Sequence, residues 1–375
     1  MVNPLVEILR CPLTRRPLRA MTEEELRKLN EGVLAMRVAF RDGTPLAEAV
    51  VEGLITDDGE YGYVIQDGIA LMLEDSAIPL GANAVKLPVE VNKNSVMEFY
   101  NDKGWEELEE GVFGDTLFED LRPVAREYVQ LSHRRLTRYL TSGKFFIDVA
   151  SGPVQYAEYL EYSEKSQYHV CVDFSLRGLR AARKRLGEKG LYVLGDITNL
   201  PFQSGTIDGG VSLHTIYHVQ KVKQLTAFEE LYRVLRPGAT AVVVYSWGKY
   251  SVAMRLIKMI ARIPRTLKRA AAKTIYRIIA PAKYRKIMEL ERRDKAEKGL
   301  IYFDPYPYSW MVSALTPRMR WRLRVWRFMS IEEMRAYLPE NEMGEKILRF
   351  VYRMEEAFPR LTGRLGQYPA IVLEK

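Results

Sequence analysis

From residue 145 onward, short apolar runs alternate with amphipathic stretches, and this alternation constrains the fold more than any other feature. The apolar runs cover residues 145–149, 168–172, 191–194, 207–213 and 239–245, and helical patterns cover 176–186 and 224–235. Strands that alternate with helices predict a parallel sheet with helices on both faces. We therefore expect a doubly wound α/β domain.

Four of the predicted strands end in small or polar residues. Residues 148–154 (DVASGPV) form a turn of mostly small residues, Asp173 follows the second run, residues 195–197 (GDI) the third and residues 212–218 (SLHTIYH) the fourth. Each alone has a structural explanation, as a tight turn or a helix cap. Ligands of such sheets bind beyond the carboxyl ends of the strands, so the ordered set of four predicts a ligand site. Asp173 lies 21 residues after Gly152, a spacing that suits a carboxylate on a ribose.

Residues 145–247 resemble the class I S-adenosylmethionine-dependent methyltransferases, in the broad group that includes quinone-biosynthesis enzymes. The residues that carry the resemblance are 148–152 (first motif), 172–175 (ribose-binding strand), 195–197 with 200–202 (adenine loop), Asp208 and 235–238 (LRPG). The resemblance covers about 100 of the 375 residues. The chain departs from it at Ala150 and Val154, where the family usually has glycine. It implies a Rossmann-like methyltransferase sheet.

The resemblance also implies S-adenosyl-L-methionine as the cofactor. Asp173 would bind the ribose hydroxyls and Asp196 the adenine amino group, while Phe174 and Ile197 would flank the adenine. The backbone at Ala150, Ser151 and Gly152 would hold the methionine part, and Asp148 is a further residue implied in cofactor binding. A nicotinamide dinucleotide would need a third glycine for its pyrophosphate, and Val154 occupies the nearest position.

Two histidines within five residues follow the fourth predicted strand. Methyl transfer is an in-line displacement, and a side chain near the cofactor can accept a proton from the nucleophile. We expect His214 to be that side chain, with His218 and Tyr217 as further candidates. The structural alternative is that His214 packs on the cofactor and His218 caps the next helix.

Residues 1–80 predict a small α+β domain, with Thr22 as a helix cap followed by three glutamates. Residues 5–12 and 63–69 resemble the start and end of the zinc-knuckle domain that activates tRNA, rRNA and release-factor methyltransferases. Thr14 stands where that domain would have its second cysteine, and the chain has only Cys11 and Cys171. Zinc sites of this type need paired cysteines, so we expect no metal and a scaffolding or substrate-gating role.

Residues 251–286 contain 11 Lys or Arg and no Asp or Glu. The whole chain has a net charge of +8, so the rest of it is mildly acidic, at −3. The apolar residues of the segment have helical spacing. These residues are Val252, Leu256, Ile260, Ile263 and Leu267. Pro264 and Pro281 should divide the helix.

Three interpretations of this basic helical segment stay open: a lid on the body, contact with an anionic membrane surface, and binding of RNA phosphates. No window is apolar enough to span a membrane, and the start of the sequence is not a signal peptide. We therefore expect a cytoplasmic protein, with peripheral contact at a membrane as an option.

The expected organisation is a domain over 1–80, a methyltransferase core over 96–250, a basic insertion over 251–300 and a C-terminal part over 301–375. The C-terminal part would complete the core and shape the acceptor pocket, and Tyr302, Phe303, Tyr306, Tyr308 and Trp310 make its start aromatic. These patterns predict methyl transfer to a small or amphiphilic acceptor, lipid-like or aromatic. The alternatives are an RNA methyltransferase and a non-catalytic scaffold with the same fold.

Overall fold

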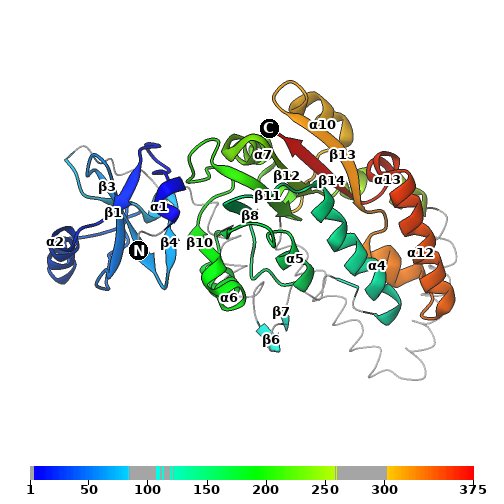
Figure 1. Cartoon of the computed structure of the whole chain (residues 1–375), viewed down its shortest axis with the longest axis horizontal. Coiled ribbons are helices and arrows are strands. Elements are labelled where there is room, and N and C mark those ends of the chain that lie inside the picture. The colour runs from blue at the N-terminus through cyan, green and yellow to red at the C-terminus, as the bar shows by residue number, and fades with distance from the viewer. Residues whose placement is uncertain are drawn as a thin grey trace, which may run out of the picture.

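The computed structural model describes residues 4–82, 84, 107–109, 112–113, 119–120, 122–257, 259 and 302–375. Figure 1 shows an N-terminal unit (residues 4–82) beside a larger α/β body that ends in a group of C-terminal helices. Its elements are α1 (Leu5–Ile8), β1 (Leu18–Ala20), α2 (Glu23–Leu34), β2 (Glu52–Thr56), β3 (Tyr61–Gln66), β4 (Ile69–Leu71), η1 (Glu74–Ser76) and β5 (Ile78–Pro79). A short hairpin, β6 (Glu107–Glu109) and β7 (Val112–Phe113), follows.

The body contains the strands and helices that the alternating pattern predicts. Up to residue 250 they are α4 (Pro123–Arg134), η5 (Arg135–Tyr139), β8 (Phe145–Val149), α5 (Ala157–Glu161), β9 (Tyr168–Asp173), α6 (Leu176–Leu186), η6 (Gly187–Lys189), β10 (Gly190–Leu194), β11 (Ile207–Leu213), η7 (Ile216–His218), η8 (Lys221–Lys223), α7 (Gln224–Val234), β12 (Leu235–Val244) and η9 (Gly248–Tyr250). The C-terminal part adds α10 (Tyr308–Leu315), β13 (Arg320–Arg327), α11 (Ile331–Tyr337), α12 (Glu342–Ala357), α13 (Pro359–Leu365) and β14 (Tyr368–Glu374).

The strand order in the body is β10-β9-β8-β11-β12-β14-β13. The first five are parallel to one another, and β14 pairs antiparallel with both β12 and β13. The chain builds outward from β8 to β10 and then returns to β11 on the other side of β8. The predicted doubly wound sheet is therefore confirmed, and its switch point lies between β8 and β11, where such sheets bind ligands.

The two faces of the sheet carry separate apolar cores, because successive side chains of a strand point to opposite faces. Phe145 and Ile147 of β8 belong to a cluster that is completed by Phe228 of α7 and Met311 of α10. Phe146 belongs to the opposite cluster, which includes side chains of α5 and α6. Helices on both faces leave the carboxyl edge of the strands as the place for a site.

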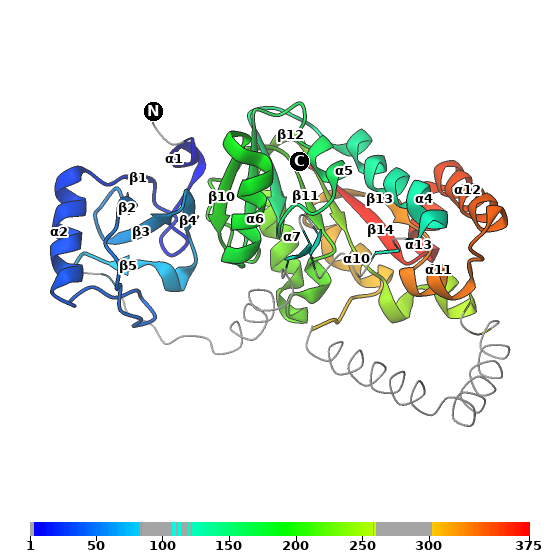
Figure 2. The same ribbon diagram turned by 90° about the horizontal axis from the view of Figure 1, so that it is seen from below.

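The strands of the N-terminal unit continue the sheet of the body instead of forming a sheet of their own. β4 pairs in parallel with β10, with Ala70 opposite Val193 (Figures 1 and 2). The side chain of Thr22 caps α2 and Glu25 completes a capping box, as the sequence around Thr22 predicts. The N-terminal unit and the body are thus joined by backbone hydrogen bonds between β4 and β10.

Two predictions differ from the structure in detail. The run expected as a strand over 239–245 belongs to β12, which begins earlier, at Leu235, and whose pairing with β11 shifts its register between Ile207 and Gly209. α13 has no counterpart among the predicted elements; it begins at Pro359, directly after Phe358 ends α12. Residues 79–95, whose Pro79, Gly81 and Pro88 predict a linker, lie largely outside the described residues.

The described start of the basic segment is helical over residues 252–257. Met254 is buried, but Val252 and Leu256, which belong to the predicted apolar stripe, are 46% and 51% exposed. The described beginning of the stripe therefore faces outward, and the rest of the segment lies outside the described residues. Among the helices that the structure describes, none has the length and apolar character needed to cross a membrane.

Candidate active site

The turn after β8 has an unusual backbone conformation. Ala150, Gly152 and Val154 have φ values of 59°, 50° and 52°, in the left-handed region that favours glycine. The backbone N–H groups of Ala150 and Ser151 both donate to the carbonyl oxygen of Val172, at 2.6 and 3.2 Å. These bonds fix the turn against the end of β9, next to Asp173.

Asp173 ends β9 and is buried. Its carboxylate accepts hydrogen bonds from the backbone N–H groups of Gly152 and Ser175, both at 2.8 Å. Burial raises its pKa to about 6, because desolvation disfavours the charged form, and the nearby Asp148 adds to the effect. Donors such as a ribose diol would stabilise the ionised carboxylate, so Asp173 fits the role that the resemblance implies.

The loop after β10, residues 195–203 (the 195–203 loop), brings Asp196 next to the end of β9. The N–H of Gly195 donates to the carbonyl of Asp173 at 2.9 Å. Oδ1 of Asp196 accepts from both the N–H and the hydroxyl of Thr198 at 2.8 Å, which orients the carboxylate. Phe174, Asp196 and Ile197 are half-buried at the ends of adjacent strands, an arrangement that fits an adenine between them.

Asp148 is less accessible than the other predicted cofactor residues. It is 2% exposed, and its Oδ2 lies 3.6 Å from Nε2 of His169, whose Nδ1 is 2.8 Å from the hydroxyl of Ser163. Asp148 therefore lies beneath the turn, where its negative charge helps to raise the pKa of Asp173. Asp208 lies at the opposite edge of the sheet, where it accepts from the N–H of Phe145 and pairs with Arg236, so it is structural.

The three predicted catalytic residues lie together after β11. Nδ1 of His214 is 3.2 Å from the hydroxyl of Tyr217, and the rings of Tyr217 and His218 are 4.5 Å apart. Nδ1 of His218 donates to the carbonyl of Tyr302 at 2.7 Å. Burial lowers the pKa of His214 to about 3 and that of His218 to about 4. Both imidazoles are therefore neutral at physiological pH.

His214 also packs against two aromatic side chains from the C-terminal strands. Its ring is 4.3 Å from that of Trp326 and 5.3 Å from that of Tyr368, both in edge-to-face geometry. Its backbone has a φ of 58°, in the left-handed region, directly after the end of β11. The structure thus combines the predicted site with residues that follow it by more than 100 positions.

A buried charged cluster beside Trp326 was missed by the sequence analysis. Arg327 and Glu119 form an ion pair of 2.6 Å, and the guanidinium group lies 4.4 Å above the Trp326 ring. The ring of His133 stacks on Trp326 at 5.7 Å, with its nitrogens 3.7 Å from Glu119 and 3.6 Å from Glu158. These residues come from three distant segments, so no local pattern could have grouped them.

Several polar atoms of this region have no hydrogen-bond partner within the part of the chain that the structure describes. They are Nε of Arg327, Oε1 of Gln155 and the hydroxyl of Ser212, whereas the two nitrogens of His133 face Glu119 and Glu158. Buried polar atoms are normally paired, so orphaned ones indicate groups that a ligand can satisfy. Gln155 follows β8 and Ser212 lies near the end of β11, which places both at the carboxyl edge. Among the described residues, no group of side chains is arranged to hold a metal ion.

Comparison with known proteins identifies part of this chain. Residues 147–243 match the family described as "Methyltransferase domain". A phthiotriol/phenolphthiotriol dimycocerosates methyltransferase of Mycobacterium leprae is 31% identical over 114 residues, which are 30% of this chain and 42% of that protein. A demethylmenaquinone methyltransferase of Paenarthrobacter aurescens is 28% identical over 138 residues, which are 34% of this chain and 53% of that protein. The chain thus spans about half the length of these relatives.

Among solved structures, an S-adenosylmethionine-dependent methyltransferase from Archaeoglobus fulgidus aligns with a TM-score of 0.37 and 15% identity, over 67% of this chain and 94% of that one. The family match covers β8 to β12, the same strands whose carboxyl ends carry the candidate site. Residues 147–243 are therefore a methyltransferase domain.

Proposed function

We propose that the whole chain is an S-adenosylmethionine-dependent methyltransferase that acts on a small hydrophobic acceptor, lipid-like or quinone-like. The observation that carries this proposal is the position of Asp173 and Asp196. Two carboxylates follow adjacent strands, beside the left-handed turn of β8, within a domain that matches the methyltransferase family. Carboxylates placed in this way suit the hydroxyl and amino donors of a nucleoside.

In this proposal each part of the cofactor has its own residues. Asp173 accepts from the ribose hydroxyls, Asp196 accepts from the adenine amino group, and Phe174 and Ile197 flank the adenine ring. The backbone over 148–152 holds the methionine part. When bound, the cofactor supplies an electrophilic methyl group on a sulfonium sulfur. The protein's contribution is to hold the acceptor atom in line with that methyl group and to exclude water.

The acceptor site that we propose lies at Trp326 and Tyr368, next to His214. Aromatic rings suit a hydrophobic acceptor, and Nε of Arg327, which has no hydrogen-bond partner among the described residues, suits a polar group on it. The two relatives are named for a phthiotriol-type lipid and for demethylmenaquinone. Both names agree with a hydrophobic acceptor.

His214 is our candidate for contact with the reacting group. Its pKa of about 3 keeps the imidazole neutral, so a ring nitrogen can accept a hydrogen bond or a proton from an acceptor hydroxyl. Tyr217 engages Nδ1, and we assign Nε2 to the acceptor. Tyr217 contacts the His214 ring, and His218 packs against Tyr217.

The proposal is tested first by calorimetry with S-adenosylhomocysteine, which binds without turnover. We expect a dissociation constant in the micromolar range, and an Asp173→Ala variant should bind about tenfold more weakly or worse. Absence of binding to the wild-type protein would instead support the non-catalytic alternative, which Val154 and Thr14 favour.

The acceptor class is tested by transfer of a labelled methyl group to demethylmenaquinol and to a phthiotriol-type lipid, presented in detergent micelles. We expect label in at least one of them. Label that appears only in added RNA would replace the hydrophobic acceptor with the RNA alternative.

We also propose that the basic segment at 251–286 contacts anionic lipid when the acceptor is membrane-bound. Val252 and Leu256 are exposed at its described start, next to a run of basic residues in the sequence. The protein should then sediment with phosphatidylglycerol vesicles, less so at high salt and not after deletion of 252–286. Sedimentation that the deletion leaves unchanged would refute this contact, and an RNA gel shift that the deletion abolishes would assign the charge to nucleic acid.

A further inference from the structure

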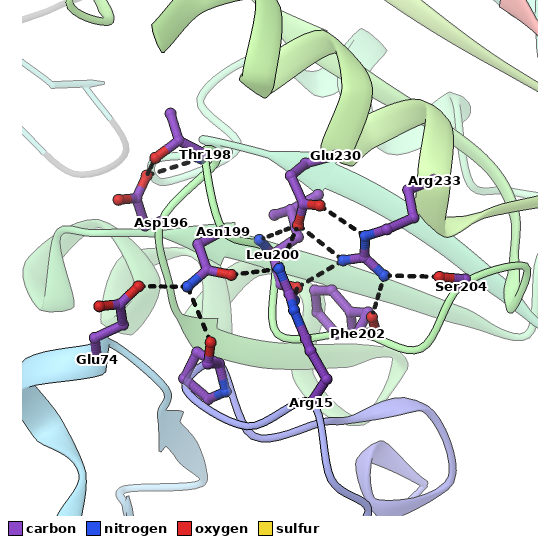
Figure 3. Close-up of polar contacts among 11 residues, drawn as sticks. Arg15, Glu74, Asp196, Thr198, Asn199, Leu200, Phe202, Ser204, Glu230 and Arg233 are labelled. Carbon is purple, nitrogen blue, oxygen red and sulfur yellow. Dashed lines mark hydrogen bonds and ion pairs between the residues drawn. The ribbon is translucent and has the colours of Figure 1, made fainter. Parts of the chain in front are cut away.

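The 195–203 loop, which carries Asp196 and Ile197, is held in place mainly by residues outside its own strands. Figure 3 shows this loop between two sets of polar side chains, one from the N-terminal unit and one from α7. Because Asp196 lies three residues before Asn199, the first of the held residues, we expect its position to depend on both sets. The following argument rests on the adenine role proposed above for Asp196.

The first attachment is a backbone seam on both sides of the loop. Before the loop, the N–H of Met72 donates to the carbonyl of Leu194 at 2.7 Å, which extends the pairing of β4 with β10. At its far end, the N–H of Arg10 donates to the carbonyl of Pro201 at 2.9 Å, and the N–H of Gln203 donates to the carbonyl of Ile8 at 2.8 Å. The N-terminal unit therefore pairs with the chain at the beginning and at the end of the loop.

The second attachment is a side-chain clamp on the middle of the loop. Nη1 of Arg15 donates to the carbonyl of Leu200 at 2.7 Å, and Nη2 of Arg15 donates to the side-chain oxygen of Asn199. The amide nitrogen of Asn199 in turn donates to the carbonyl of Pro12 at 3.1 Å and to the carboxylate of Glu74. Asn199 thus uses both ends of its side chain on the N-terminal unit (Figure 3).

The third attachment is a set of hydrogen bonds from side chains of α7 to the loop. The carboxylate of Glu230 accepts from the N–H of Leu200 at 2.8 Å and lies 3.3 Å from Nη2 of Arg15. Arg233 donates to Glu230 and to the carbonyls of Leu200 and Phe202, at 2.9 and 2.7 Å for the two carbonyls. Arg15 therefore links the N-terminal unit, the loop and α7 in one network (Figure 3).

We propose that Arg15 is a positioning residue for the cofactor site: it holds the 195–203 loop in the conformation that presents Asp196 and Ile197 to the adenine. Arg15 does not contact the cofactor. Ordering a loop costs conformational entropy, and a loop that is ordered before binding spares the ligand that cost. The N-terminal unit is on this account part of the cofactor site, and affinity for the cofactor depends on it.

The test compares Arg15→Ala with Arg16→Ala in the full-length chain. Arg16 is the adjacent arginine, but it pairs with Asp57 and Asp58 inside the N-terminal unit, so it is a matched control. We expect the dissociation constant for S-adenosylhomocysteine to rise about five- to tenfold in Arg15→Ala, as the loss of one or two hydrogen bonds predicts, and to stay within about twofold in Arg16→Ala.

Hydrogen exchange gives a readout that does not depend on ligand binding. Without ligand, Arg15→Ala should increase amide exchange in a peptide covering 195–203 and leave a peptide within β11 unchanged. Adding S-adenosylhomocysteine at saturation should restore the protection of the loop. A substitution that merely weakened the whole fold would increase exchange in both peptides and lower the melting temperature in parallel.

The outcomes separate the two proposals. If the wild-type protein does not bind S-adenosylhomocysteine, the proposed function fails. If the wild-type protein binds but Arg15→Ala binds equally well with an unchanged loop, the positioning role is wrong. Should Arg15→Ala not fold, Glu74→Ala removes the contact on the other side of Asn199, and unchanged affinity and loop exchange in that variant would equally overturn the proposal.

Discussion

At the scale of single residues, the candidate site combines backbone strain with a buried charge. Ala150 and Val154 adopt left-handed conformations that cost a non-glycine residue about 1–2 kcal/mol each. Asp173 is buried with backbone N–H groups as its described hydrogen-bond partners. Both features cost folding free energy, and strain of this kind is concentrated at functional sites. Three predictions belong to this scale.

Ala150→Gly should leave the free energy of unfolding unchanged or raise it by up to about 1 kcal/mol. Glycine removes the steric cost of the positive φ, and its greater freedom in the unfolded chain offsets part of that gain. Ala182→Gly, in the buried face of α6, is the control and should lower the free energy of unfolding by about 1 kcal/mol or more. Urea unfolding measures both variants. An equal decrease in the free energy of unfolding of the two would contradict backbone strain at Ala150.

Affinity for S-adenosylhomocysteine should fall as the pH drops below the pKa of Asp173, about 6. The ribose hydroxyls donate to the ionised carboxylate, and at pH 5 only about one tenth of the carboxyl groups are ionised. We therefore expect about tenfold weaker binding at pH 5 than at pH 7.5. Calorimetry of Asp173→Asn should show weak binding that hardly changes over the same range; a parallel decline in that variant would assign the pH dependence to another group.

His214→Phe should lower kcat by about 10²-fold or more while affinity for S-adenosylhomocysteine changes less than about twofold. Phenylalanine keeps the ring between Trp326 and Tyr368 but removes the nitrogens. A kcat near that of the wild type would assign His214 to packing alone. The pH profile of the remaining activity would then identify another proton acceptor, with His133 as the next residue to change.

At the scale of elements, close contacts between helices and strands fix the geometry of the site. β13 and β14 pair antiparallel and bring Trp326 and Tyr368 to His214. α13 holds β13 from outside, and Figure 1 shows the helix beside the strand. The carbonyl of Gly363 in α13 also accepts a hydrogen bond of 2.8 Å from the indole of Trp247.

Gly363→Ala should lower the free energy of unfolding by about 2–3 kcal/mol. A Cβ atom at this position would lie 2.2 Å from the backbone carbonyl oxygen of Arg324, and backbone cannot move aside as a side chain can. Arg360→Ala, on the exposed face of the same helix, should change it by less than about 0.5 kcal/mol. Thermal and urea unfolding compare the two; similar effects in both variants would contradict the close approach.

Sequence patterns identified most elements but not every boundary. The 176–186 helix and the 207–213 strand have the predicted limits, because one side of each is uniformly apolar. β12 extends back through Pro237 and Gly238, since pairing with β11 and not local propensity sets its start. The candidate cofactor residues were found because each follows a strand directly. Trp326 and Arg327 were missed because their relation to His214 depends on how β13 folds back.

At the scale of the whole molecule, the N-terminal unit and the body share one continuous sheet. Its seam consists of backbone hydrogen bonds between β4 and β10, together with Arg15 and Asn199. The helical C-terminal part is also joined to the body, by a buried ion pair of 2.8 Å between Arg135 and Glu355. Contacts of this kind couple the stability of segments that are far apart in sequence.

The N-terminal unit and the body should therefore unfold together. Calorimetry is expected to show one transition, and native-state hydrogen exchange should give β3 and β9 similar opening free energies. Met72→Pro removes the N–H that donates to Leu194 and should separate the transition into two steps. Two transitions in the wild-type protein, the smaller from residues 4–82, would refute the coupling.

The sequence by itself determined the fold class and the order of the ligand-bearing strand ends. Hydrophobic periodicity and the residues next to strand ends are local properties of the chain. The periodicity can be read from the sequence because each helix or strand buries one face. Only the tertiary structure decided what surrounds those residues: Arg15 on the 195–203 loop, and Trp326, Arg327 and Glu119 beside His214. Such contacts form between segments up to about 200 positions apart, because the sheet places distant strands side by side, and no local pattern encodes that pairing.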